Sequence, residues 1–201
     1  MGKPVIGLVG GIGSGKSRVA AAFAARGGKV ISGDAAGHEA LRQPEIRERV
    51  VRRWGQQVLD EKGEIDRRAV ARVVFADPAE LRALEEIVHP WIGRRLREEI
   101  AAAQSDPAVP FVVLDAAVML EAGWNNVCDK LVYVDAPRAE RLRRLAAQRG
   151  WTEKEVAARE SNQLPRSEKI TRADCVVDNS GPPEAAARQV DDLLRRWGLL
   201  R

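Results

Sequence analysis

The feature that most constrains this chain is the glycine-rich segment at residues 10–17. It reads Gly-Gly-Ile-Gly-Ser-Gly-Lys-Ser and matches the phosphate-binding pattern G-x-x-x-x-G-K-S/T in full. A short apolar run, Val5–Val9, precedes it, and an alanine-rich segment of helical composition, residues 17–26, follows it. Glycines allow the left-handed turns in which backbone amides surround an anion, and the amino end of a following helix favours that anion further. This context predicts a strand–loop–helix unit that binds a nucleoside triphosphate.

The loop supplies most of the candidate nucleotide ligands. Its glycines offer backbone amides, the Lys16 ammonium can reach the outer phosphates, and the Ser17 hydroxyl can ligate Mg²⁺. The candidates are Gly11, Gly13, Ser14, Gly15, Lys16, Ser17 and Arg18.

Length and composition indicate one soluble domain that carries an insertion or a lid. The chain has 201 residues, of which 45% are hydrophobic and 31% charged, as is usual for a globular protein. The first apolar run is too short for a signal peptide, and no run approaches the length of a membrane span. Cys128 and Cys175 are the only cysteines, so we expect no disulfide framework and a cytoplasmic location.

The basic charge balance does not indicate a nucleic-acid partner. The net charge is +4, but the arginines are interspersed with acids, as in Glu45-Ile-Arg-Glu-Arg49, which is typical of a solvated helix face. Aromatic residues make up 4% of the chain, too few for a platform that stacks single-stranded bases.

Five short, β-branched segments with little alternation are candidate strands of a buried parallel sheet. They are Val5–Val9, Lys29–Ser32, Pro110–Leu114, Lys130–Val134 and Asp174–Val177. Helical segments lie between them, and this alternation predicts a three-layer α/β/α sandwich around a five-stranded parallel sheet.

A long helical stretch interrupts this alternation between the second and third strands. We expect an all-helical insertion over residues 36–106, helical throughout. Asp77 before Pro78, with Glu80 following, is typical of a helix N-terminus. Pro90 is expected to end one helix and begin another, in which case His89 would cap the second helix.

Acidic residues follow three of the predicted strands. Ligands of parallel α/β sheets bind beyond the carboxyl ends of the strands, where Asp34, Asp115 and Asp135 are expected. Asp34 could orient or deprotonate an attacking hydroxyl, or could cap the helix Ala35–Leu41. Asp115 or Asp135 could hold the Mg²⁺ shell, although Asp135 could equally cap the next helix.

A cluster of arginines predicts a lid over residues 138–172. Thr152 to Glu155 resembles a capping box that opens a separate helix, and Gly150 would join two helices into a flap. An arginine-bearing flap can neutralise a transferring phosphate while it excludes water.

Motifs along nearly the whole chain resemble those of the dephospho-CoA kinase family. They are the loop Gly7–Ser17, Val30-Ile-Ser-Gly-Asp34, Asp66-Arg-Arg-Ala69, Val74-Phe75, Ile87-Val-His-Pro90, Leu114-Asp115 through Glu121-Ala-Gly123, Arg141-Leu142, Arg149-Gly150, Arg159, Gln163, Lys169, Ala173-Asp174, and Asp178-Asn179 with Gly181. The sequence departs from the family pattern at Val9, Arg18, Ser32, His38, Ala117 and Val118.

This resemblance implies a P-loop kinase that moves the γ-phosphoryl group of ATP to the ribose 3′-hydroxyl of dephospho-CoA. The catalytic residues would be Lys16, Asp34, Arg141 and Arg149. Asn179 and Gly181 would complete the ATP site, unless they form a plain turn or a helix cap. The acceptor would contact Asp34, His89, Asp115 and Glu121.

The resemblance further implies that Ser17 and Asp115 hold the metal, Mg²⁺. Residues 36–106 would then be the CoA-binding insertion of a single kinase domain, 1–201. The partners would be ATP and dephospho-CoA, with no nucleic acid or membrane, and the protein would be a monomer or a small homo-oligomer. Two alternatives remain, a kinase of the nucleoside monophosphate or shikimate type and a non-catalytic nucleotide-binding protein.

Overall fold

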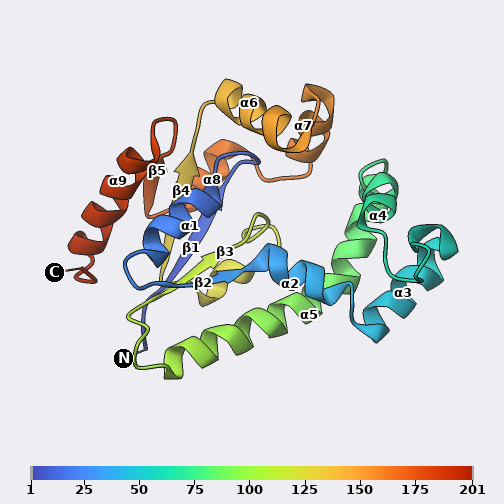
Figure 1. Ribbon diagram of the computed structural model, residues 1–201, viewed down its shortest axis with the longest axis horizontal. Coiled ribbons are helices and arrows are strands. Elements are labelled where there is room, and N and C mark those ends of the chain that lie inside the picture. The colour runs from blue at the N-terminus through green and yellow to red at the C-terminus, as the bar shows by residue number, and fades with distance from the viewer. Residues whose placement is uncertain (1, 201) are drawn as a thin grey trace. The chain divides into compact units, whose positions relative to one another are not determined.

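The computed structural model describes residues 2–200. The chain forms two compact units, which are described separately (Figure 1). One unit contains the segments up to Gly33 and from Arg97 onward, and the other spans Asp34–Leu96.

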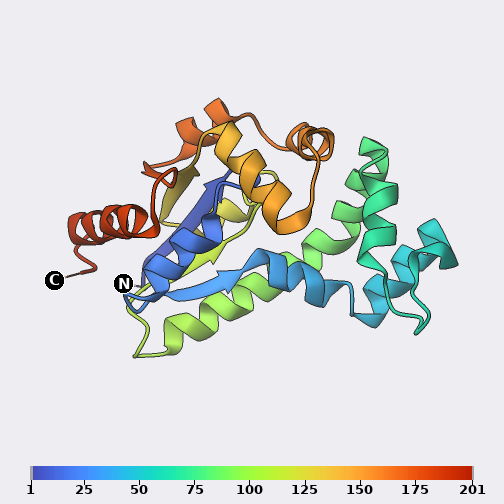
Figure 2. The same ribbon diagram turned by 45° about the horizontal axis from the view of Figure 1, so that its top comes forward.

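The first unit is built on a five-stranded, all-parallel sheet (Figures 1 and 2). Its strands are β1 (Val5–Gly10), β2 (Lys29–Ser32), β3 (Val112–Asp115), β4 (Lys130–Asp135) and β5 (Cys175–Asp178). Their order in the sheet is β2-β3-β1-β4-β5, with β1 paired to β3 and β4 on either side. All five expected strands are confirmed, and every boundary lies within two residues of the prediction.

Helices cover the sheet as the apolar pattern requires. The helices of this unit include α1 (Lys16–Ala24), α6 (Arg138–Arg149), α7 (Glu153–Glu160), α8 (Arg166–Arg172) and α9 (Pro183–Arg196), and η2 (Trp124–Val127) is a 3₁₀ turn. On one face of the sheet, Phe23 of α1 and Leu194 of α9 join Ile6 and Leu8 in a single buried cluster. Gly7, between Ile6 and Leu8, faces the other side of the sheet, and the Met119 side chain lies where a Cβ atom of residue 7 would be.

The second unit is mainly helical. It contains α2 (Gly33–Ala40, from Asp34 on), α3 (Pro44–Trp54), the 3₁₀ turn η1 (Gln56–Val58), α4 (Arg67–Val74) and most of α5 (Pro78–Ser105). The expectation of helix throughout is wrong for residues 59–66, where Leu59 and Ile65 form an antiparallel bridge. The Asp60 carboxylate accepts hydrogen bonds from the backbone of Lys62 and Glu64, which favours the turn over a helix.

Helix α5 passes through Pro90 without a break, so the predicted helix boundary at that residue is wrong. A proline inside a helix costs about 3 kcal/mol because one hydrogen bond is lost. Burial of Ile87, Val88 and Ile92 around it offsets this cost. His89 therefore lies within a helix and does not cap one. The predicted start of this helix is confirmed, because the Asp77 carboxylate accepts a hydrogen bond from the Ala79 amide at 2.8 Å.

Within residues 2–200, no helix is both long enough and apolar enough to cross a membrane.

Candidate active site

The glycine-rich loop joins β1 to α1 in the conformation that anion binding requires. Gly13 and Gly15 have positive φ angles of 75° and 84°, which residues with a side chain rarely adopt. The Ser14 amide donates to Gly11 O at 3.1 Å, and Gly15 is the N-cap of α1. Lys16 is the first residue of that helix. The loop therefore presents amides and a helix amino end at the carboxyl edge of the sheet.

The buried side chains of Asn179 and Arg144 hold the loop through hydrogen bonds to its backbone. Asn179 Nδ2 donates to Ser14 O at 2.7 Å, and Arg144 donates to Ser14 O at 3.2 Å and to Asn179 O at 2.7 Å. A Cβ atom on Gly15 would lie 2.3 Å from Asn179 Nδ2, so this approach needs a glycine. Hydrogen bonds from Arg143 and Arg144 lower the pKa of Glu140 to about 2, and that carboxylate holds Arg144 in place.

Sequence reasoning did not select Arg144 as a functional residue. It lies three positions after Arg141 on α6, so the two side chains share one face of the helix. This spacing relates Arg144 to Arg141, but it does not reveal the contact of Arg144 with Asn179 O, 35 positions along the chain. Arg18 contacts the same region, because its guanidinium lies 3.4 Å from both Asn179 Oδ1 and Gly181 O.

Arg141 lies at the loop, whereas Arg149 lies against an aromatic ring. The Arg141 guanidinium donates to Ile12 O at 3.0 Å and pairs with Glu160 of α7 at 2.5 Å. Arg149 is stacked over the Trp151 ring, with its guanidinium carbon 4.9 Å from the ring centroid. The capping box that opens α7 is confirmed, and Gly150 ends α6 in the left-handed conformation.

Two side-chain oxygens meet where α1 begins and β3 ends. Ser17 Oγ donates to Asp115 Oδ2 at 3.4 Å. A hydroxyl and a carboxylate are the ligand types that Mg²⁺ prefers, and the metal usually completes its shell with water and substrate phosphates. No group of three or more His, Cys, Asp or Glu side chains suited to a metal occurs in the part of the chain that the structure describes.

The carboxylates of Glu121 and Asp135 contact helix α8 and the residues just before it. Glu121 pairs with the buried Lys169 at 2.8 Å and accepts from the Leu164 amide at 2.9 Å. Asp135 accepts two hydrogen bonds from Arg166, at 2.6 and 3.2 Å. The interpretation of Asp135 as a helix cap is wrong, because the N-cap of α6 is Pro137.

In the second unit, Asp34 lies in the first turn of α2. Strand β2 ends at Ser32 and α2 begins at Gly33, so Asp34 comes two residues after the strand. The helix begins at Gly33, so Asp34 is not its N-cap. One turn further on, burial lowers the pKa of His38 below its ordinary value of 6.5, and the charge of Arg67 adds to the shift. Burial also lowers the pKa of His89 on α5.

Comparison with known proteins gives a consistent result. Residues 4–184 match the family model described as dephospho-CoA kinase. A dephospho-CoA kinase from Anaeromyxobacter dehalogenans is 42% identical over 194 residues, covering 94% of this chain and 90% of that protein. One from Thermus thermophilus is 40% identical over 190 residues, with the same two coverages.

Solved structures show the same fold. A crystal structure of a Thermus thermophilus protein aligns with a TM-score of 0.81 at 38% identity, and covers 98% of both chains. Shikimate kinase from Acinetobacter baumannii aligns with a TM-score of 0.52 at 16% identity, covering 97% of this chain and 93% of its own. At that identity the likeness shows a common fold alone.

Proposed function

The chain belongs to the dephospho-CoA kinase family, and from this premise we propose how its residues carry out the reaction. The enzyme transfers a phosphoryl group from ATP to dephospho-CoA, the last step of CoA biosynthesis. The observation that carries this function is the family match over residues 4–184, which include the whole phosphate-binding loop.

The loop would bind the ATP phosphates through its backbone amides. Lys16 opens α1, and from there its ammonium would reach the outer phosphates. Arg141, fixed between Ile12 O and Glu160, would stabilise the charge that develops on the transferred group. Arg149 would have to leave the Trp151 ring to do the same.

Mg²⁺ would be held by Ser17 and Asp115, whose oxygens already lie 3.4 Å apart. Bound there, the metal would neutralise charge on the β- and γ-phosphates. The Ser17 hydroxyl would keep its place at the amino end of α1, and the Asp115 carboxylate would remain at the end of β3.

Asp34 would orient the ribose 3′-hydroxyl of the acceptor and accept its proton. Its place two residues after the carboxyl end of β2 supports this role, because acceptors of parallel α/β folds bind beyond that edge. His89 and Glu121 would also contact the acceptor. Glu121 already pairs with Lys169, so it would contribute less to that contact. We further propose that residues 36–106 form the acceptor-binding insertion and residues 138–172 the lid.

We propose that the enzyme works in the cytoplasm as a monomer or small homo-oligomer. Cys128 and Cys175 are both free thiols, as expected in a reducing compartment.

A coupled assay of ADP release tests the function. ATP and Mg²⁺ are supplied with dephospho-CoA, with a panel of nucleoside monophosphates, or with shikimate. We expect ADP with dephospho-CoA alone, and CoA as the second product. Turnover with another acceptor would overturn the acceptor assignment, and tight ATP binding without any turnover would favour a non-catalytic nucleotide-binding protein.

A further inference from the structure

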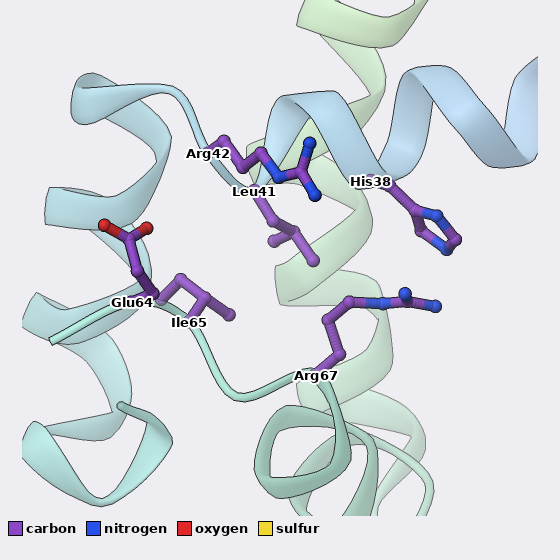
Figure 3. A pocket seen from close by; sticks show the side chains of 6 residues that line it. All are labelled: His38, Leu41, Arg42, Glu64, Ile65 and Arg67. Atoms are coloured by element: carbon purple, nitrogen blue, oxygen red, sulfur yellow. The ribbon is translucent and has the colours of Figure 1, made fainter. Parts of the chain in front are cut away.

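A pocket of about 550 Å³ lies in the second unit (Figure 3). The side chains that line it are His38, Leu41, Arg42, Glu64, Ile65 and Arg67. All six fall within residues 36–106, the proposed acceptor-binding insertion, so the pocket adds no site beyond the proposed function. A separate feature lies in the first unit, on the last turn of helix α7.

The carboxylate of Glu160 joins two arginines of helix α6. Its Oε1 atom lies 2.5 Å from Arg141 Nη1, and its Oε2 atom lies 3.4 Å from Arg138 Nε. Arg138 and Arg141 are three residues apart, so their side chains share one face of α6. Because Glu160 is the last residue of α7, these contacts attach the end of α7 to α6.

The pair formed with Arg141 is the more sheltered of the ion pairs between these two helices. The side chains of Arg141 and Glu160 are 13% and 25% exposed. Arg138 and Glu153, which also pair across α6 and α7, are 44% and 67% exposed. Water and salt weaken an exposed ion pair, whereas a charged hydrogen bond that is withdrawn from water is stronger and better fixed. Glu160 is therefore suited to hold the Arg141 guanidinium in one place.

The same guanidinium lies against the phosphate-binding loop. Arg141 Nη1 donates to Ile12 O at 3.0 Å. A Cβ atom built on Gly11 would lie 3.2 Å from Nη1, 3.4 Å from Cζ and 3.7 Å from Nε, so the guanidinium lies across that residue. In the part of the chain that the structure describes, both hydrogen bonds of this guanidinium use Nη1. A guanidinium has five N–H donors, which leaves the three on Nε and Nη2 for an anion bound at the loop.

We propose that Glu160 is a positioning residue for phosphoryl transfer. It fixes one nitrogen of Arg141, and the remaining donors of that guanidinium are thereby presented to the transferred group. Arginine has one of the largest side-chain entropies, so an arginine that is already fixed loses less freedom when it binds phosphate. The inference rests on the proposed function, because it takes Arg141 as the residue that stabilises the transferred group.

Kinetics of matched variants test the proposal. Glu160→Gln keeps the shape of the side chain and removes its charge. We expect kcat to fall about 10-fold, because a misplaced catalytic group commonly costs that much or more, while the KM for ATP stays within about 2-fold. Glu160→Asp keeps the charge and should recover part of kcat. The control is Glu153→Gln, on the same helix, which also pairs with Arg138 but not with Arg141 and should change kcat by less than about 2-fold.

A double-mutant cycle separates positioning from support of the fold. Arg141→Met alone should lower kcat by more than Glu160→Gln does. If Glu160 acts through Arg141, then adding Glu160→Gln to Arg141→Met should lower kcat by less than about 2-fold further. A residue that only supports the fold would lower kcat by the same factor in both backgrounds. Melting temperatures of all variants within a few degrees of the wild type exclude misfolding.

The outcomes separate this proposal from the function itself. Wild-type kcat in Glu160→Gln, or an equal fall in both backgrounds, would overturn it. A higher kcat would show that Glu160 restrains Arg141 and would overturn it too. If Glu153→Gln lowers kcat as much as Glu160→Gln, the effect comes from the Arg138 pairs, and Glu160 does not position Arg141. If the wild type does not phosphorylate dephospho-CoA, the function has failed and the proposal fails with it.

Discussion

At the scale of single residues, the proposed reaction depends on one carboxylate, that of Asp34. Asp34→Asn keeps the shape of the side chain and removes its capacity to accept a proton. We expect kcat to fall by about 100-fold or more, because general-base contributions are commonly of that size. The KM for ATP should not change. Steady-state ADP release measures both constants.

The control for this change is Glu39→Gln on the same helix, where the carboxylate pairs with Arg95 at 3.1 Å. Its turnover should remain close to that of the wild type. Near-native turnover of the Asp34→Asn variant would remove Asp34 from the mechanism.

The chain has two histidines, and both titrate below the ordinary value. Burial lowers the pKa of His89 below 6.5, so protonation favours the unfolded chain. Its contribution to stability is therefore complete above 6.5 and is lost as the pH falls through the folded-state pKa. We expect the melting temperature to fall as the pH is lowered from about 8 to about 5.

His89→Gln should remove part of this acid dependence, measured by thermal unfolding across the pH range. His38→Gln should remove less, because the His38 side chain is only partly withdrawn from water and is more exposed than that of His89. An unchanged slope in the His89→Gln variant would show that carboxylates alone cause the acid dependence.

At the scale of elements, helix α6 fixes the phosphate-binding loop. Arg144→Met removes the hydrogen bond to Asn179 O, while Ser14 O keeps its donor Asn179 Nδ2. One buried carbonyl left without a donor costs about 1–3 kcal/mol. We expect a loss of that size in the free energy of unfolding, together with a raised KM for ATP. Urea unfolding and steady-state kinetics measure the two effects.

The matched control is Arg143→Gln, the next residue on α6, whose side chain is 71% exposed and pairs with Glu140. It should change the stability by less than about 1 kcal/mol, as surface pairs do. If Arg144→Met neither lowers the free energy of unfolding nor raises the KM for ATP by more than this control does, α6 does not hold the loop.

The sequence predicts the strands well because each is a short apolar run next to a clear turn signal. It fails at Pro90, because the burial that offsets the lost hydrogen bond comes from tertiary packing. It also does not separate Arg144 from the other lid arginines. Arg144 donates to Asn179 O, a residue 35 positions away, and no local pattern contains that contact.

At the scale of the whole molecule, the two units differ in how the chain forms them. The chain leaves the sheet unit after β2 and returns to it within α5. The unit Asp34–Leu96 is therefore an insertion between β2 and β3, which are neighbours in the sheet. The loop, Arg141 and Asn179 belong to the first unit, and helices α2, α3 and α4 belong to the second apart from Gly33. Under the proposed function, ATP would contact the first unit and the acceptor would contact residues 36–106 of the proposed insertion.

Hydrogen exchange measured by mass spectrometry tests that assignment. A non-hydrolysable ATP analogue with Mg²⁺ should slow exchange in peptides covering residues 10–18 and 141–149, because the loop amides become hydrogen-bonded to phosphate. Dephospho-CoA alone should slow exchange mainly in residues 34–42, which contain Asp34, and in the rest of the proposed acceptor-binding insertion. Protection by dephospho-CoA confined to the first unit would contradict this division, since the acceptor would then bind without the insertion.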